Sequence, residues 1–155
     1  CESPLNDVRL LFGAFPDVPL VAAERALPPS GVERDTVTLL DRSRDKLSVP
    51  LWVAMSKLSN ILRVDFSFVV LNRYNKAHDL RMHHDKPELW GGVAILSLGE
   101  PCTFWLEAQN GDRFVFPQRH GDVVWLDEKA NANLLHGGRM PAGRFSLVMR
   151  ERCGP

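Results

Sequence analysis

The sequence lacks a cysteine framework. It has three cysteines in 155 residues, Cys1, Cys102 and Cys153, and no two of them lie close together. An odd, scattered set excludes the disulfide-rich secreted class and the paired Cys-x-x-Cys spacing of structural zinc sites. The set fits a reducing compartment, so the expected location is intracellular, with the cytoplasm favoured.

Excess charge and long apolar runs are lacking too. The 19 Lys and Arg balance 19 Asp and Glu, so the formal net charge is zero. Sequence-independent nucleic-acid binding depends on excess positive charge, so tight binding of that kind is not expected. No apolar run approaches the ~20 residues that span a bilayer and no signal peptide is recognisable, so no membrane association is expected. Because the first residue is not Met, we expect a fragment or a processed product. A monomer is expected, or part of a larger chain.

Short strands dominate the sequence after residue 64. The composition, 45% hydrophobic and 25% charged, is that of one globular domain. Turns rich in Gly, Asp, Asn or Pro separate most of six β-branched or aromatic runs: FSFVVLNRY, GGVAILSL, CTFWLE, DRFVF, DVVWL and RFSLVMR. Many short strands without alternating helices predict a sandwich or barrel and exclude a doubly wound fold.

Two helices are predicted ahead of these strands. Residues 49–64, VPLWVAMSKLSNILRV, repeat apolar side chains at helical spacing, and Pro50 suits the first turn. We expect this helix to pack on the outside of the β-structure. A shorter helix over residues 21–27 should end at the double proline that follows it. Residues 33–48 are expected to form a strand and then a long surface loop.

The segment RMHHDKPE, residues 81–88, places two adjacent histidines before an acid. Alternate side chains of a strand share a face, so His83 and Asp85 should point one way and His84 the other. Such a His-x-Asp pair offers one nitrogen and one oxygen to a metal ion. A second histidine would complete the two-His-one-carboxylate set of non-haem Fe(II) oxygenases. Alone the pair is common by chance, and ordinary surface polarity is the alternative.

Two downstream histidines are candidates for the third ligand. His120, in RHGDVVWL, is predicted in the turn before a strand. His136, in NLLHGGR, lies at the end of an apolar stretch and before a double-glycine turn. Beyond it, RFSLVMR supplies Arg144 and Arg150, and a guanidinium there suits the far carboxylate of a dicarboxylate co-substrate. Only His136 makes the set coherent.

From about residue 49 to residue 150 the chain resembles the AlkB-type Fe(II)/2-oxoglutarate dioxygenases, which act on alkylated bases. FSFVVLNRY followed by RMHHDKPE is similar to the family's Asn-x-Tyr segment and His-x-Asp strand. GGVAILSLGEPCTFWLE is similar to the strand pair that follows. HGDVVWLDEKANANLLHGG resembles the stretch before the distal histidine, and RFSLVMR the closing Arg-aromatic-x-Leu-x-x-Arg motif. The four segments occur in the family's order.

The resemblance implies a mainly β fold with a flanking helix, namely a double-stranded β-helix or jelly roll with iron at one mouth. His83, Asp85 and His136 would bind Fe(II). With 2-oxoglutarate and O2, the implied reaction demethylates a base such as 1-methyladenine or 3-methylcytosine in RNA or single-stranded DNA, releasing formaldehyde and succinate. The implied layout is an N-terminal extension with a substrate-recognition lid, residues 1–48, and a core, residues 49–155.

The resemblance also implies five residues that bind the co-substrate. Arg144, helped by the Tyr74 hydroxyl, would pair with the far carboxylate of 2-oxoglutarate. Asn72 would form a hydrogen bond with the end of 2-oxoglutarate that lies near the iron. Arg150 would lie near the iron-binding carboxylate and orient the groups there. The family usually has Asn where this chain has Ser146, whose shorter reach predicts weaker co-substrate affinity. Packing for Tyr74, and a plain surface strand end for Arg150, are the alternatives.

Substrate recognition is less clearly indicated. Residues 30–48 contain no aromatic side chain, so the family's aromatic lid has no evident counterpart. Trp90, shortly after the His-x-Asp strand, is the candidate for an aromatic wall of the pocket or for its rim. The candidates for phosphate contacts are Arg42, Arg44 and Lys46. Acids interrupt this basic run, so a solvated mixed-charge face is the alternative. The expected partner is methylated single-stranded RNA or DNA.

Two other functions fit part of this pattern. One is a 2-oxoglutarate oxygenase of the same architecture that hydroxylates a protein side chain or a small molecule, which the missing aromatic lid and zero net charge favour. The other is a non-enzymatic jelly-roll binding module with a vestigial metal site, which leaves the presence of all the implied ligands and arginines unexplained. Stimulation of 2-oxoglutarate turnover by methylated oligonucleotides, rather than by peptides, would separate base demethylation from hydroxylation of a protein or small molecule. Unchanged function after Asp85→Ala would support the binding module.

Overall fold

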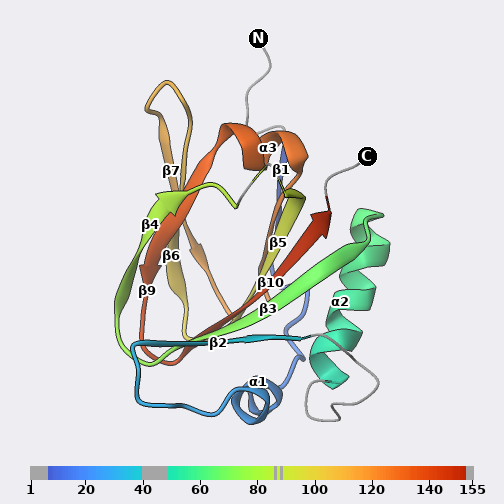
Figure 1. Cartoon of the computed structure of the whole chain (residues 1–155), viewed down its shortest axis with the longest axis vertical. Coiled ribbons are helices and arrows are strands. Elements are labelled where there is room, and N and C mark those ends of the chain that lie inside the picture. The colour runs from blue at the N-terminus through green and yellow to red at the C-terminus, as the bar shows by residue number, and fades with distance from the viewer. Residues whose placement is uncertain (1–6, 40–48, 86, 88, 153–155) are drawn as a thin grey trace.

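The computed structural model describes residues 7–39, 49–85, 87 and 89–152, which form ten strands and three helices (Figure 1). The strands are β1 (Val8–Leu11), β2 (Arg34–Thr38), β3 (Phe66–Tyr74), β4 (His78–His83), β5 (Trp90–Gly99), β6 (Cys102–Glu107), β7 (Arg113–Gln118), β8 (Val123–Leu126), β9 (Leu135–Met140) and β10 (Arg144–Arg152). The helices are α1 (Leu20–Ala26), α2 (Val49–Leu62) and α3 (Glu128–Asn133).

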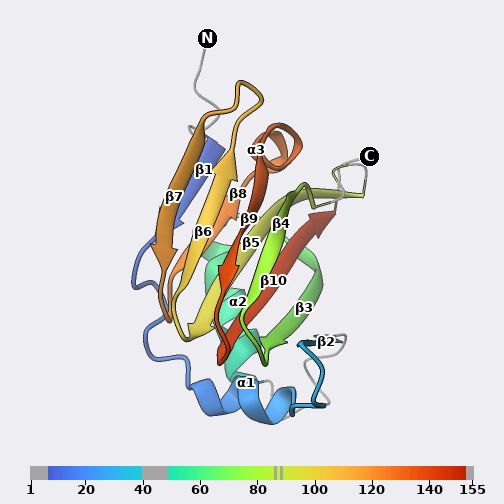
Figure 2. The same ribbon diagram turned by 90° about the vertical axis from the view of Figure 1, so that its left-hand side faces the viewer.

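The strands form two antiparallel sheets. The larger has six strands in the order β1-β8-β5-β10-β3-β2, and the smaller has four in the order β4-β9-β6-β7. Figure 2 shows the smaller sheet in front of the larger one, with α2 behind both. Strands distant in sequence are neighbours in both sheets, which is the interleaved order of a jelly roll. The predicted mainly β fold with a flanking helix is therefore confirmed.

Each face of the larger sheet covers a hydrophobic cluster. Between the sheets, buried side chains come from both of them: Val93, Ile95, Phe104, Leu106, Leu126, Met140 and Val148. On the opposite face, α2 buries the stripe Leu51, Ala54, Met55 and Leu58. Alternate residues of β3 and β10 therefore point between the sheets, where the site described below lies.

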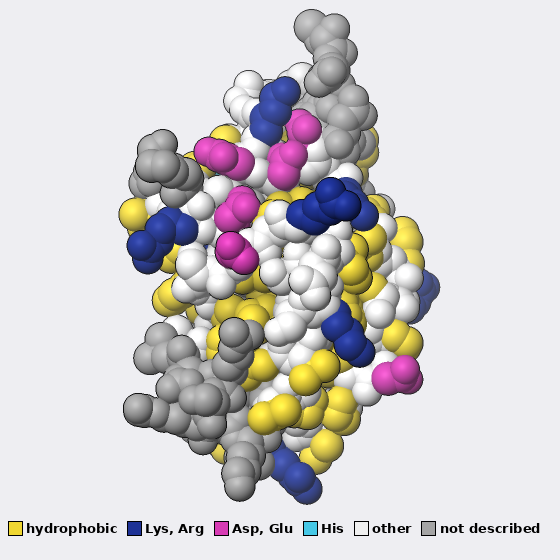
Figure 3. Space-filling model, turned by 90° about the vertical axis from the view of Figure 1, so that its right-hand side faces the viewer, with side chains coloured by type: hydrophobic (Ala, Val, Ile, Leu, Met, Phe, Trp, Pro, Cys, Tyr) yellow, Lys and Arg dark blue, Asp and Glu magenta, His cyan; other side chains and the backbone are white. Residues whose placement is uncertain are grey.

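The outer face of α2 is partly apolar. Figure 3 shows this side of the molecule, on which hydrophobic side chains lie between separate basic and acidic ones. Val49, Val53 and Ile61 of α2 are exposed. None of the helices in the described ranges has both the length and the apolar character needed to cross a membrane.

The sequence does not indicate three of the elements, β1, α3 and β9. The double-glycine turn predicted after His136 is wrong, because Gly137 and Gly138 lie within β9. A Cβ on Gly137 would lie 2.6 Å from the backbone oxygen of Leu80, and one on Gly138 would clash with that of Thr103. The two glycines thus allow β9 to run close between β4 and β6.

Part of the N-terminal extension joins the larger sheet. β1 pairs with β8 at one edge, and β2 pairs with β3 at the other. The predicted phosphate-binding residues Arg42, Arg44 and Lys46 lie outside the described residues. The division of the chain at residue 48, and the lid, stay predictions.

Candidate metal centre and co-substrate pocket

β4 and β9 bring the three predicted metal ligands together. The two strands pair with His83 opposite His136, and the ring centroids of these residues are 4.3 Å apart. One candidate ligand atom from each of His83, Asp85 and His136 lies within 4.8 Å of the other two. Two imidazole nitrogens and one carboxylate oxygen gathered in this way form the donor set of non-haem Fe(II) sites, which leaves metal positions open for other ligands.

A hydrogen bond selects the nitrogen that His83 presents, and burial keeps the His136 ring neutral. Nδ1 of His83 lies 2.6 Å from the carbonyl oxygen of Arg81, which only accepts, so Nδ1 is the donor. Nε2 keeps its lone pair and lies 3.8 Å from Oδ1 of Asp85. His136 is buried, and burial, reinforced by the nearby His83, lowers its pKa to about 3. Its ring is therefore neutral near pH 7, as metal binding requires.

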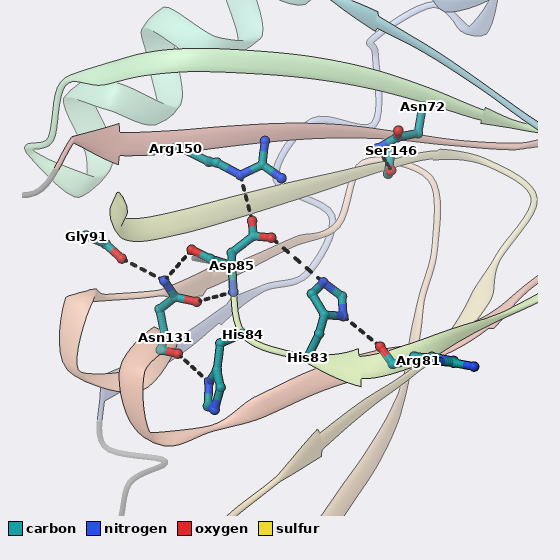
Figure 4. Close-up of polar contacts among 9 residues, drawn as sticks. All are labelled: Asn72, Arg81, His83, His84, Asp85, Gly91, Asn131, Ser146 and Arg150. Atoms are coloured by element: carbon teal, nitrogen blue, oxygen red, sulfur yellow. Dashed lines mark hydrogen bonds and ion pairs between the residues drawn. The ribbon is translucent and has the colours of Figure 1, made fainter. Parts of the chain in front are cut away.

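Asp85 lies just beyond β4 rather than within it. The strand ends at His83, where its pairing with β9 ends, so the expectation of one strand carrying both ligands is wrong. The Asp85 carboxylate still faces the His83 ring and accepts a 2.8 Å hydrogen bond from Nε of Arg150 (Figure 4). Burial pushes the pKa of Asp85 up, but Arg150, with the two histidines, outweighs burial and lowers it. The carboxylate is thus ionised near neutral pH.

His84 does not face the other ligands. Its ring is directed away from the Asp85 carboxylate, and its Nδ1 lies 2.9 Å from the backbone oxygen of Asn131 (Figure 4). This orientation agrees with the expected alternation of the two adjacent histidines.

We therefore expect His83→Ala and His84→Ala to differ sharply. Loss of a ligand at His83 should weaken Mn(II) binding by more than the ~10–100-fold typical of outer-sphere changes, whereas His84→Ala should change it by about threefold at most. Titration of the metal-free protein with Mn(II), followed by electron paramagnetic resonance, measures both. Equal losses in the two variants would contradict the assignment of His83.

A cavity of about 290 Å³ opens beside the three ligands. Its volume is near the lower end of the ~300–1,000 Å³ typical of small-molecule sites. It is lined by all five residues predicted to bind the co-substrate: Asn72, Tyr74, Arg144, Ser146 and Arg150. Apolar side chains and two residues of β2 complete much of the lining: Val70, Leu80, Ile95, Phe104, Met140, Val148, Arg34 and Thr36. The structure thus joins the predicted metal and co-substrate residues in one cavity.

Strand register explains why the co-substrate residues meet. In the β3–β10 ladder, Arg144 lies opposite Tyr74 and Ser146 opposite Asn72. Nδ2 of Asn72 donates to Oγ of Ser146 at 3.2 Å, and its Oδ1 accepts from Thr36 Oγ1 at 2.8 Å. The Asn72 amide therefore keeps a second N–H for a ligand.

Arg144 is a buried cation that no carboxylate of the described residues pairs with. It is 1% exposed, and its Nε and Nη1 atoms have no hydrogen-bond partner among the described residues. Burial lowers the pKa of Arg144, with Cys102 and Tyr74 acting in the opposite direction. An unpaired buried guanidinium is costly, and a bidentate carboxylate is the ligand that matches its geometry. This residue therefore fits a co-substrate that carries a carboxylate.

Trp90 lies beside the cavity and is not one of the lining residues. Its ring stacks on Phe68, with centroids 5.2 Å apart and planes at 17°. The Arg150 guanidinium lies 5.7 Å from the centroid of the Phe68 ring. Phe68 was not identified from the sequence. The available signal was its position in β3, an even number of residues before Asn72 and hence on the same face.

Comparisons with known proteins agree with this architecture. No family model and no curated protein matches the sequence. Among solved structures, OsALKBH1 is 16% identical, with a TM-score of 0.65 over 94% of this chain and 96% of the other. A 2OG-Fe(II) oxygenase family oxidoreductase from Burkholderia pseudomallei is 18% identical, with a TM-score of 0.66 over 95% and 84%. A Pseudomonas putida prolyl-4-hydroxylase is 17% identical, with a TM-score of 0.64 over 95% and 93%.

These likenesses define the fold of the chain. It has the jelly-roll fold of 2OG-Fe(II) oxygenases, as the sequence resemblance predicted. The structure also contains the His83–Asp85–His136 cluster that the sequence predicted as a metal site.

Proposed function

We propose that the protein is an Fe(II)- and 2-oxoglutarate-dependent dioxygenase that demethylates N-alkylated bases, such as 1-methyladenine or 3-methylcytosine, in RNA or single-stranded DNA. One observation carries the proposal: a single cavity contains both the His83–Asp85–His136 cluster and the buried Arg144, two of whose guanidinium nitrogens have no partner in the part of the chain that the structure describes. A metal site and a lone guanidinium in one cavity suit a co-substrate with a chelating end and a carboxylate end. 2-Oxoglutarate has both ends.

The residues of the cavity position the reactants. When bound, iron with 2-oxoglutarate and O2 supplies the chemistry that oxidises a methyl group. Arg144 and Tyr74 receive the far carboxylate of the co-substrate, and the free N–H of Asn72 donates to its other end. Arg150 holds the Asp85 carboxylate toward the two histidines. The apolar lining limits water around these groups, which strengthens their electrostatic interactions.

A methylated base is the favoured substrate for three reasons. Each of the four segments similar to AlkB-type enzymes supplies residues to the lining of this cavity. The Phe68–Trp90 pair beside Arg150 offers a stacking surface for an unstacked base. Arg34, exposed at the cavity, offers a contact for a neighbouring phosphate. With zero net charge, we expect binding to be modest and to weaken with added salt.

A second candidate function is hydroxylation of a protein side chain or a small molecule. The likeness to the prolyl-4-hydroxylase structure matches that to OsALKBH1, with TM-scores of 0.64 and 0.65. The absence of aromatic residues from positions 30–48 also favours this function over base recognition.

Mass spectrometry of methylated oligonucleotides distinguishes the two candidates. The protein is incubated in air with Fe(II), ascorbate, 2-oxoglutarate and a single-stranded DNA or RNA bearing 1-methyladenine or 3-methylcytosine, with Asp85→Ala as the control. We expect the methyl group to be lost only with the unaltered protein. An intact oligonucleotide, together with steady formation of succinate, would favour the second candidate. No turnover of either compound would contradict both.

A further inference from the structure

Asn131 is a fully buried polar residue that the proposed chemistry does not use. It lies on α3, the helix between β8 and β9, and is five residues before His136. Asp127 caps the N-terminus of α3 by accepting a hydrogen bond from the backbone of Ala130. From this fixed helix, the Asn131 side chain reaches the chain that leaves β4, next to the metal ligands (Figure 4).

The Asn131 amide bonds to both backbone polar groups of Asp85. Its Oδ1 accepts from the Asp85 N–H at 3.0 Å, and its Nδ2 donates to the Asp85 carbonyl at 3.1 Å. The same Nδ2 donates to the carbonyl of Gly91, at the start of β5, also at 3.1 Å. The amide therefore does for Asp85 what a neighbouring strand does for a residue in a ladder.

The contact between Asn131 and Asp85 lies just beyond the point where β4 stops pairing with β9. The β4–β9 pairing ends at His83 and His136, so Asp85 has no strand partner on that side. Among the described residues, the Asp85 carboxylate accepts one hydrogen bond, from Arg150. Without the Asn131 amide, the backbone N–H and C=O of Asp85 would be left without hydrogen bonds. Because unsatisfied buried polar groups are costly, we expect the backbone at Asp85 to change conformation. Arg150 alone would then have to orient the carboxylate.

The geometry points to Asn131 as a positioning residue, which fixes the Asp85 backbone so that the carboxylate faces His83 and His136 before the metal binds. This inference rests on the metal site of the proposed function. The segment EKANANLL contains α3, which carries Asn131, and leads directly to His136. Asn131 thus ties the Asp85 end of the site to the segment that supplies His136.

The test compares metal affinity with stability. Asn131→Ala removes the amide, and Asn131→Asp keeps its size while losing both N–H donors. Leu58→Ala, a fully buried position of α2 in the other hydrophobic cluster, is the matched control for general destabilisation. For each metal-free variant, we would measure Mn(II) affinity by electron paramagnetic resonance, the midpoint of thermal unfolding, and hydrogen exchange of the Asp85 amide by NMR.

Both Asn131 variants are expected to bind Mn(II) about 10–100-fold more weakly, as when a ligand loses its outer hydrogen-bond partner. Leu58→Ala should lose stability through its cavity but keep its Mn(II) affinity within about threefold. The Asp85 amide should exchange faster in Asn131→Ala than in Leu58→Ala of similar stability. Affinity losses that simply follow stability in all three variants, or an unchanged affinity in Asn131→Ala, would overturn the inference.

Failure of the proposed function gives a different result. If the unaltered protein binds no Mn(II), the proposed metal site is wrong. The Asn131–Asp85 contact then has no role in metal binding. Hydrogen exchange needs no metal, so it still tests whether Asn131 stabilises the backbone at Asp85. Selectively faster exchange at Asp85 in Asn131→Ala would support the positioning of Asp85, whereas equal exchange in Asn131→Ala and Leu58→Ala would overturn it.

Discussion

Replacing Arg144 by methionine is expected to stabilise the protein without 2-oxoglutarate and to remove most of its affinity for 2-oxoglutarate. Arg144 is fully buried, and two of its guanidinium nitrogens have no partner among the described residues. Replacing a poorly compensated buried charge by an apolar side chain of similar volume typically stabilises by ~1–4 kcal/mol. We therefore expect the free energy of unfolding of the ligand-free protein to rise by about 1–3 kcal/mol.

The same substitution should have the opposite effect on binding. Removing one partner of a buried ion pair costs ~3–5 kcal/mol, which corresponds to a loss of about 10²–10⁴-fold in 2-oxoglutarate affinity. Added 2-oxoglutarate should raise the unfolding midpoint of the unaltered protein and leave that of Arg144→Met almost unchanged. Thermal unfolding with and without the co-substrate and Mn(II) measures both effects.

Arg144→Lys is the matched control. Lysine keeps the positive charge but lacks the planar fork that bonds both oxygens of a carboxylate. It should bind 2-oxoglutarate more weakly than the unaltered protein and more strongly than Arg144→Met. A methionine variant that is less stable, and binds the co-substrate normally, would show that Arg144 is a structural residue and would remove the main support for a dicarboxylate site.

The elements that could be predicted from the sequence are those that local pattern decides. The runs FSFVVLNRY and CTFWLE coincide with β3 and β6, and the helix expected over residues 49–64 spans Val49–Leu62. The helix repeats apolar side chains at helical spacing, CTFWLE alternates with the period of a strand, and FSFVVLNRY is rich in β-branched and aromatic side chains. Such signals need no knowledge of the neighbouring strands.

β9 shows why local pattern does not suffice elsewhere. Its sequence, LHGGRM, contains two adjacent glycines, which usually mark a turn. The segment is a strand because β4 and β6 pair with it from both sides. Those partners are distant in sequence, and the close approach of their backbones is what requires glycine. The pairing, and with it the position of His136 opposite His83, follows from the assembled sheet.

The candidate site, too, could be predicted from the sequence only in part. The spacing of His83 and Asp85 predicts two ligands locally, and family resemblance adds His136 and Arg144. The contact from Asn131 to Asp85 joins residues 46 positions apart, and no periodicity in the sequence encodes it. That no carboxylate of the described residues pairs with Arg144 is likewise a property of the folded protein, because it depends on which side chains the two sheets bring together.

Asp85→Asn is expected to cost the protein its metal. Asp85 is the one anionic group among the three candidate ligands, and its pKa is held low chiefly because Arg150 outweighs the effect of burial. Asparagine preserves the size of the side chain and the hydrogen bonds between the backbone of residue 85 and Asn131. The backbone there should therefore keep its conformation. Mn(II) affinity should still fall by at least about 100-fold, beyond the ~10–100-fold range of outer hydrogen-bond partners, because the charged ligand itself is lost. Formation of succinate from 2-oxoglutarate should fall with it.

The comparison of Asp85→Asn with Asp85→Ala separates charge from shape. Both remove the carboxylate that accepts from Arg150, but alanine also empties the space between Arg150 and His83. If charge governs the site, both variants lose metal and turnover together while the Asp85 amide stays protected from exchange by its bond to Asn131. If either variant binds Mn(II) within about threefold of the unaltered protein, the ligand set is wrong, since loss of even an outer partner usually costs more. Retained binding of a nucleic acid or peptide without metal or turnover in the unaltered protein would instead support a jelly-roll binding module with a vestigial metal site.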